Sequence, residues 1–539
     1  MTGLAIDVVT LLPALIPLAG VLVVLVADLV VPRLRGLPYA VAAVASLGAA
    51  GAAIPGVAAG AGTVRTTFCL SAGWFSPGGG SFSYTPGEAS PYTSAMAASE
   101  CLWRAGALGS SLQLGAGLAA AVCLALAWPV ARARPAESTR EPIEAILFLT
   151  ALTGTVVVAA SRDIGTWLVA LELATLPVIA LVALTGTRAA LAGAMQLLVT
   201  SLVSFALLAV GAALWFLATG APFFSPDAAL AAGQVPAGTV AAAAPAPSVA
   251  LLSLSLVLVL AGLGFKLSLV PFHAWTPTAY AGSTPAVATF LATVSKIGAL
   301  AALLVLVQAL SGLGTPGLLA VAVLSAVTMT LGNVMALRQD DVVRLLAWST
   351  VAQAGWVILP LVSISALGQR SAGIYLLTYV AATLVAFAVV ARTVQEVGAR
   401  GRGMAAYAGL WLRSPWRAGA LALALTSLAG LPPGVIGLVG KIVAFRPVIV
   451  EGWVWLALVA AGNAVLGVAV YLRWLRPVLN PSEAETGSAP VEPAAAGQAG
   501  PSAVLAGRRL AITVALVASV LVLLAVSIQP QLLLGLFGT

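Results

Sequence analysis

The sequence is poor in ionisable and metal-binding side chains. Its 539 residues include one histidine, three cysteines and three lysines, and only 8% of them are charged. So small a supply argues against a haem, iron–sulfur or zinc site, and no glycine-rich phosphate-binding loop is present. The basic residues stand singly and form no patch with interleaved aromatic residues. The sequence therefore predicts no metal, no cofactor in this chain and no nucleic acid partner.

Apolar residues dominate instead and define the class of protein. They make up 61% of the chain, which is more apolar surface than a soluble core of this length can hide. A helix needs roughly 20 apolar residues to cross a lipid bilayer. On this basis we predict an all-α polytopic membrane protein with about fourteen transmembrane helices and the lipid bilayer as its surroundings.

Arginine supplies all but three of the basic charges, and its distribution predicts the orientation. With the N-terminus outside, seventeen arginines fall on inner loops and five on outer loops. This bias places both termini on the outer face. The first apolar stretch is not preceded by a basic residue and is too long for a signal peptide, so we expect it to be retained as a helix.

Loops and charges divide the chain into five expected regions. They are an N-terminal three-helix region 1–140 with an extended outer loop 62–106, a first repeat 141–312, a second repeat 313–476, a polar inner linker 477–509 and a final transmembrane helix 510–539. Cys69 and Cys101 lie in the outer loop. A disulfide between them and two free thiols are equally compatible with the sequence.

Charged residues inside the apolar runs are the candidate functional residues. Glu172 lies in the middle of one run, five residues before a proline. Lys266 precedes Pro271, and Lys441 follows the proline pair at 432–433. Prolines interrupt helices, and two interrupted segments at matching places in two halves of a chain are typical of an internal repeat around an ion path. We therefore predict two broken helices.

Lysine suits proton transfer, because a desolvated lysine can release its proton whereas arginine keeps its own. Lys296 lies between the broken helices and is the candidate for passing a proton from one half to the other. His273, the only histidine, is either a relay or a hydrogen-bonding residue. Purely structural roles are the alternatives. Glu172 could belong to a static ion pair that holds two helices together, and Lys266 and Lys441 could extend from helix ends to the membrane surface.

Four motifs in the same order resemble the antiporter-like membrane subunits of respiratory complex I, and most of all the N-subunit family of bacterial NADH–quinone oxidoreductase. The motifs are GFKLSLVPFHAWTP at 264–277, STPAVATFLATVSK at 283–296, GNVMALRQ at 332–339 with RLLAWST at 344–350, and LAGLPPGVIGLVGK at 428–441.

The resemblance covers roughly residues 141–476 and carries several implications. It implies fourteen helices with two inverted five-helix repeats. Glu172, Lys266, Lys296 and Lys441 match the intramembrane acid and lysines of the family's proton path. The family also implies the bacterial inner membrane, other membrane subunits of complex I as partners, and NADH, FMN, iron–sulfur clusters and quinone in partner subunits.

The chain departs from the family pattern at several polar positions. A lysine usual early in the sixth span is replaced by Met195 or Gln196. Thr278 stands where the family usually has Asp, Ala281 where it has an acidic or amide residue, and Gln353 near the place of a Ser-His pair. These changes leave Glu172 without its usual nearest cation.

We therefore predict a proton-translocating membrane subunit, one part of an NADH:quinone oxidoreductase, that couples electron transfer in partner subunits to proton movement. The alternatives are an Mrp-type or stand-alone cation/proton antiporter, a divergent paralogue in a related complex with a different electron donor, and a purely structural membrane spacer.

Overall fold

The computed structural model describes residues 6–31, 34, 36–59, 64–70, 100–128, 140–224, 249–307, 309, 314–480 and 503–538. Its first half contains the helices α1 Val8–Val30, α2 Leu37–Ala58, α4 Ala107–Leu126, α5 Arg140–Val158, α6 Ile164–Ala183, α7 Arg188–Thr219, α9 Val249–Leu267, α10 Trp275–Gly282, α11 Pro285–Ala292 and α12 Val294–Val307. Its second half contains α13 Gly314–Ala336, α14 Val342–Ile358, η4 Leu359–Val362, α15 Ala366–Val397, η5 Gly398–Arg402, η6 Met404–Tyr407, α16 Leu410–Arg413, α17 Pro415–Ala429, α18 Val435–Val450, α19 Val454–Leu479, α20 Ala503–Ile528, α21 Gln531–Leu534 and η8 Gly535–Phe537.

The predicted all-α membrane class is confirmed. Within the described ranges, thirteen helical segments are long and apolar enough to cross a membrane. The expected span 415–448 is not among them, because the structure divides it into α17 and α18, of 15 and 16 residues. The expected inner linker is shorter than 477–509, since α19 continues to Leu479 and α20 begins at Ala503. The two inverted repeats stay a prediction.

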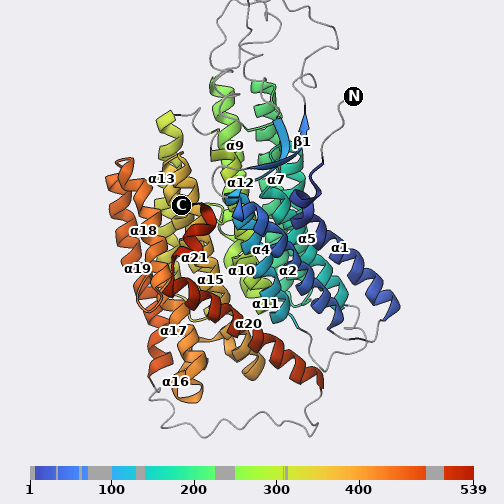
Figure 1. The fold of residues 1–539 in the computed structure, drawn as a ribbon. Coiled ribbons are helices and arrows are strands. Elements are labelled where there is room, and N and C mark those ends of the chain that lie inside the picture. Colours follow the sequence, from blue (N-terminus) through green and yellow to red (C-terminus); the bar gives the residue numbers. More distant parts are fainter. Residues whose placement is uncertain are drawn as a thin grey trace, which may run out of the picture.

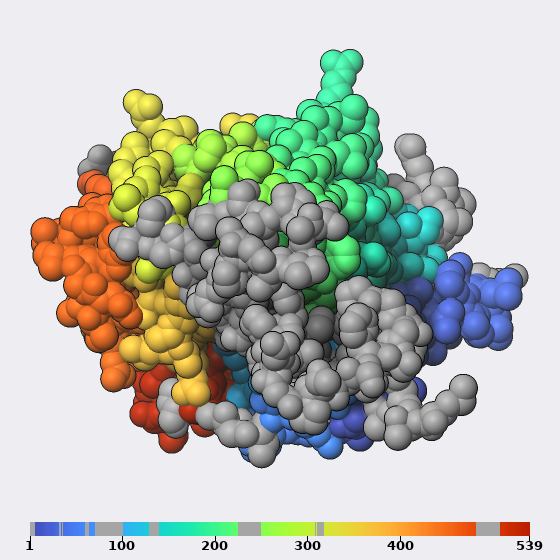
Figure 2. Space-filling view, turned by 90° about the horizontal axis from the view of Figure 1, so that it is seen from above, coloured from blue at the N-terminus to red at the C-terminus, as the bar shows by residue number. Residues whose placement is uncertain are grey.

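The helices form an elongated bundle with α1 near one edge and α19 at the other (Figure 1). Viewed from above, the segments from blue to green and those from yellow to orange occupy opposite sides (Figure 2). In the segments Pro285–Val307, Val342–Val362 and Ala366–Arg402, 94% of the most apolar window is buried, against 33% in α1 and α19. The helices α11, α12, α14 and α15 thus form the protein-covered centre, while α1 and α19 are largely uncovered by the rest of the chain.

Breaks in three helical segments bring polar backbone into this centre. The α9 helix ends at Leu267, and Ser268 adopts a left-handed conformation with φ 67°. The α17 helix ends before Gly430, which has φ 80°, a conformation that glycine adopts without a steric cost. A third break, at Thr293 between α11 and α12, interrupts the expected continuous span 285–309. The carbonyls freed at such helix ends need partners other than the helix itself.

A small β-hairpin is the exception to the helical fold. Strands β1 (Arg65–Leu70) and β2 (Glu100–Ala105) are antiparallel and place Cys69 opposite Cys101. The structure joins these two cysteines in a disulfide. The hairpin lies against the turn between α5 and α6, where Arg162 donates its backbone N–H to the Leu102 carbonyl at 2.9 Å. Burial, together with nearby Arg104, lowers the pKa of Arg162 to about 10.

The described ends of the chain lie on the same side of the bundle as the hairpin. The Asp7 N–H donates to Thr67 of β1, and the Ser111 hydroxyl donates to the Leu536 carbonyl at 2.6 Å. The ring of Phe537 fills the space above Gly373 of α15, where an added methyl group would come within 2.6 Å of it. The α20 helix crosses α15 and α4 obliquely before this segment (Figure 1).

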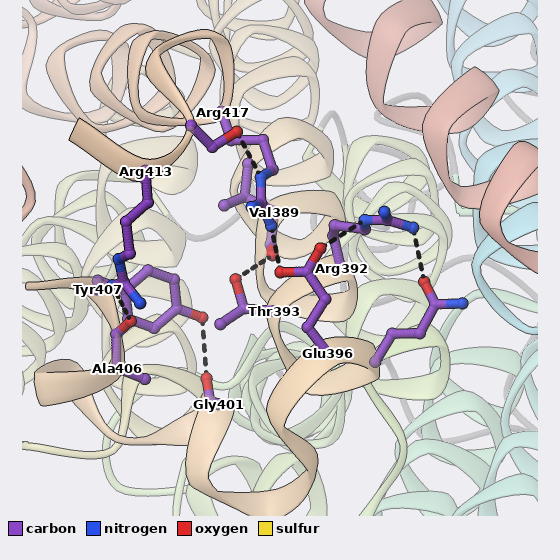
Figure 3. A network of polar contacts seen from close by, with 11 residues as sticks. Val389, Arg392, Thr393, Glu396, Gly401, Ala406, Tyr407, Arg413 and Arg417 are labelled. Atoms are coloured by element: carbon purple, nitrogen blue, oxygen red, sulfur yellow. Dashed lines mark hydrogen bonds and ion pairs between the residues drawn. The ribbon is translucent and has the colours of Figure 1, made fainter. Parts of the chain in front are cut away.

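Several arginines interact near α16, which lies at the opposite end of the bundle from β1 (Figure 1). Figure 3 shows Glu396 of α15 between two of them, with Arg417 at 2.6 Å and Arg392 at 3.1 Å. Arg413 donates to the carbonyl of Ala406 at 3.0 Å. These contacts attach the end of α15 to the start of α17. The end with the arginines is the one that the charge bias assigns to the inside.

Candidate functional site

Lys266 and Glu172 form an ion pair inside the first half. Lys266, in the last turn of α9, brings its Nζ to 2.9 Å from a Glu172 carboxylate oxygen on α6. The same Nζ donates to the Thr175 hydroxyl at 2.7 Å. The side chains are 6% and 15% exposed, so the pair is largely removed from solvent and lipid. Thr175, one helical turn after Glu172, completes the contacts of the ammonium group.

A cavity of about 20 Å³ lies beside this ion pair. Its lining includes Lys266, Thr175, Trp275 and Ser295. This volume suffices for about one water molecule, and the polar atoms around it provide the partners that a buried water needs. The site can therefore accept a proton carrier next to the carboxylate and the ammonium group.

Lys296 is the second buried lysine of the first half. It lies in the first turn of α12, directly after the break at Thr293, and is 2% exposed. Its Nζ donates to the Lys266 carbonyl at 3.0 Å and to the Ser268 hydroxyl at 2.6 Å. It also lies 4.8 Å from the centre of the Trp275 ring. Its partners are therefore a carbonyl at the negative C-terminal end of α9, a hydroxyl and an aromatic face.

Lys441 occupies a matching environment in the second half. Its Nζ donates to the carbonyl of Ala429, the last residue of α17, at 2.5 Å. It lies 5.3 Å from the centre of the Trp356 ring. Gly430 is needed beside it, because an added methyl group would come within 3.0 Å of the Lys441 side chain. By its surroundings Lys441 resembles Lys296, since both cap a broken helix end and face a tryptophan.

Neither of these two lysines forms a salt bridge with any residue that the structure describes, in contrast to Lys266. A buried ammonium group with only carbonyl, hydroxyl and aromatic neighbours is costly to keep charged. The sequence predicted all four residues inside the membrane, with Lys266 and Lys441 on broken helices. The structure brings Glu172, Lys266 and Lys296 together. Lys441 lies apart from them, across α14 and α15.

His273 lies on the loop between α9 and α10 and is half-buried. Its ring centre is 5.2 Å from that of Trp348 on α14. No hydrogen bond to Lys266, Lys296 or Glu172 is found for it in the described chain. The structure thus packs the His273 ring against Trp348, and the relay role remains a prediction.

Two of the positions where the chain departs from the family pattern contact each other. The Thr278 hydroxyl donates to the Gln196 side-chain carbonyl at 2.6 Å. The Gln196 amide donates in turn to the Ala274 carbonyl at 3.2 Å. Met195 points away, with 61% of its surface exposed. Gln196 rather than Met195 therefore faces α10, where it forms a neutral hydrogen bond with Thr278.

Two glutamates near the start of α5, one buried and one half-buried, were not among the predicted site residues. The Tyr39 hydroxyl donates to Glu144 at 2.8 Å, and the Gly36 N–H donates to Glu141 at 3.1 Å. Glu141 is 7% exposed. Their spacing of three residues places them on one face of a helix. That spacing at the start of an apolar run was the available signal.

Among the described residues, no group of three or more His, Cys, Asp or Glu side chains could hold a metal ion. Comparison with known proteins then defines the class. The family model described as NADH:quinone oxidoreductase/Mrp antiporter, TM, matches residues 161–467. This match spans more than half of the chain and the whole of the Glu172–Lys441 site.

Similarity to individual proteins identifies the subfamily within this class. NADH-quinone oxidoreductase subunit N of Salinispora tropica is 37% identical over 484 residues, which are 87% of this chain and 84% of that protein. A chain of respiratory complex I from Thermus thermophilus with bound aureothin superposes with a TM-score of 0.69 at 27% identity, covering 97% of this chain and 98% of that one. A chain of the Mrp complex from Dietzia sp. has a TM-score of 0.72 at 20% identity, covering 99% and 97%, which shows a common fold. The chain belongs to the family of NADH-quinone oxidoreductase subunit N.

Proposed function

We propose that this chain moves protons across the membrane as a subunit of an NADH–quinone oxidoreductase. Glu172, Lys266, Lys296 and Lys441 are the groups that take up and release the protons. The observation that carries this role is the pair of lysines, Lys296 and Lys441, buried at broken helix ends without a carboxylate partner. Such groups are expensive in a membrane and serve proton or ion paths.

The two lysines of the first half, Lys266 and Lys296, each have a reason to change protonation state during a pumping cycle. The ion pair between Lys266 and Glu172 stabilises the charged forms of both groups, whereas Lys296 has no counter-ion of its own. A rearrangement that separates the pair would leave two uncompensated charges in the interior, which is strongly unfavourable. Proton transfer between the pair, the adjoining water-sized cavity and Lys296 relieves this cost.

Electron transfer belongs to partner subunits in this proposal. Those subunits would hold FMN and iron–sulfur clusters and would act on NADH and quinone, while this chain contributes the membrane path. Its direct partners are other membrane subunits of complex I, lipid and protons. The apolar outer faces of α1, α7 and α19 are the surfaces available for these subunits and for lipid. Both termini would face the outside of a bacterial inner membrane.

Purification of the tagged chain from its native membrane tests the proposal. Subunits that oxidise NADH should co-purify, and the complex in proteoliposomes should acidify one side when NADH is added. A variant that combines Lys296→Met with Lys441→Met should retain electron transfer but move fewer protons per electron. Cation exchange by the isolated chain would favour an antiporter, and full pumping by the double variant would indicate a structural spacer.

A further inference from the structure

A row of buried hydroxyl and amide side chains lies between Lys296 and Lys441. It begins on α10, crosses α14 and α15 and ends on α19. Every member is at most 4% exposed: Tyr280, Ser349, Thr350, Gln353, Tyr375, Tyr379 and Tyr471. We call this set the polar row. None of it is used by the proton path described above.

Tryptophans connect the polar row to the two lysines. At one end, the Trp275 ring below Lys296 lies 6.5 Å, centre to centre, from the ring of Tyr280. At the other end, the Trp356 ring facing Lys441 stacks on Tyr375, with the ring centres 5.8 Å apart. The polar row therefore spans the interval that a proton would cross between the two halves.

Hydrogen bonds join the members of the polar row in two neighbouring groups. Thr350 and Tyr379 join their hydroxyls at 2.9 Å, beside the hydroxyl of Tyr280. At the preceding residue of α14, Ser349 and Tyr471 join theirs at 2.6 Å. These hydrogen bonds come from three helices, so the polar row also fixes α14, α15 and α19 relative to each other.

Gln353 is the one member that is not a hydroxyl. The Tyr375 hydroxyl donates to its side-chain carbonyl, and its amide donates to the Tyr471 hydroxyl at 2.9 Å. A hydroxyl can pass a proton by accepting one and releasing its own. A primary amide neither takes up nor releases a proton near neutral pH, although it fixes one donor and one acceptor direction. Gln353 thus bridges Tyr375 and Tyr471 by hydrogen bonds but cannot itself transfer a proton between them.

The surroundings provide no substitute for Gln353. Within the described parts of the chain, no carboxylate, ammonium or imidazole group hydrogen-bonds or ion-pairs with a member of the polar row. We infer that Gln353 interrupts proton transfer between the two halves, so that Lys296 and Lys441 serve separate routes. The inference rests on the proposed function and revises the expectation that Lys296 passes its proton to the second half.

Replacement of Gln353 by histidine tests the interruption. A neutral imidazole offers one donor and one acceptor, as the amide does, but it also ionises near pH 6.5. Gln353→Leu removes both hydrogen bonds and adds no titratable group. Asn463→His is the matched control, because Asn463 is a buried amide, 3% exposed, about two turns away from Tyr471 on α19. Assembly is checked by the size of the complex and its NADH–quinone rate.

Proton flux through the complex in proteoliposomes is measured under an imposed membrane potential, without NADH. We expect Gln353→His to raise this flux several-fold, most strongly near pH 6–7, and Gln353→Leu and Asn463→His to leave it at the wild-type level. An assembled Gln353→His complex with unchanged flux would overturn the inference. So would an assembled Gln353→Leu complex whose NADH-driven pumping falls as far as that of Lys296→Met, because Gln353 would then belong to the route.

Different results would contradict the proposed function and the interruption at Gln353. Normal pumping by the lysine variants contradicts the proposed function itself. If those variants pump poorly and Gln353→His shows no extra proton flux, the proposed function stands and only the inference about Gln353 is overturned.

Discussion

Replacement of Lys296 by arginine separates a titrating lysine from a fixed positive charge. Lys296 is 2% exposed, and its ammonium group has a carbonyl at 3.0 Å, a hydroxyl at 2.6 Å and an aromatic ring at 4.8 Å as neighbours. The guanidinium group of arginine can donate to the same carbonyl and hydroxyl and can stack on the same ring. The variant therefore keeps the charge and the contacts of the site while it removes the ability to release a proton.

The size of the expected loss of pumping follows from the pKa of the guanidinium group. The pKa of a guanidinium lies so far above neutral pH that fewer than about 1 in 10⁵ unperturbed groups are neutral at pH 7. A step that needs the neutral form at position 296 would then be too rare to contribute to turnover. We expect Lys296→Arg to assemble normally, to transfer electrons from NADH to quinone, and to lose the protons that this subunit contributes.

Inverted membrane vesicles or proteoliposomes provide the assay, with the proton-to-electron ratio as the readout. Lys296→Met is the companion variant and should lose the same protons, because it removes the titrating group together with its charge. Near-normal pumping by Lys296→Arg in a fully assembled complex, with Lys296→Met impaired, would refute the titrating role. Lys296 would then be a fixed charge that stabilises the end of α9.

Three further predictions address other parts of the chain. Glu172→Gln should assemble but pump fewer protons per electron, since the amide keeps a hydrogen bond to its lysine partner and cannot be protonated; an unchanged ratio would contradict this. Mass spectrometry without reduction should recover Cys69 joined to Cys101 from native membranes, and the detection of two free thiols would exclude the bridge. Gln196→Lys alone should lower the thermal stability of the purified complex. Adding Thr278→Asp to the same chain should restore the stability, with a coupling energy of about 0.5–3 kcal/mol between the two substitutions. Additive effects of the two substitutions would show that these side chains do not interact.

Charged residues in apolar runs were predictable from the sequence because their position alone makes them costly. Glu172 and Lys266 are 94 residues apart, yet both could be assigned to the membrane interior before their contact was known. Prolines also marked the breaks beside Lys266 and Lys441. The break at Thr293 carried no such signal, because a proline or glycine does not occur within it.

The polar row could not be predicted in the same way. Serine, threonine and tyrosine are common in membrane helices, where a hydroxyl often bonds to a carbonyl of its own helix, as Thr378 does with Ile374. Nothing in the sequence distinguishes such residues from those that reach a neighbouring helix. The contact of Gln353 with Tyr375 and Tyr471 depends on how α14, α15 and α19 pack, which is a property of the whole fold.

The contact between Ser111 and Leu536 constrains how the protein is made. The two residues are 425 positions apart, so at a synthesis rate of about 5–20 residues per second α4 waits roughly 20–85 s for its partner to leave the ribosome. During that interval the space above Gly373 that Phe537 later fills stays open. Membrane-insertion factors or neighbouring subunits have access to this surface until Phe537 emerges, and its docking against Gly373 closes it. Attachment of the α21–η8 segment to α4 and α15 is therefore a late event in the assembly of this end of the bundle.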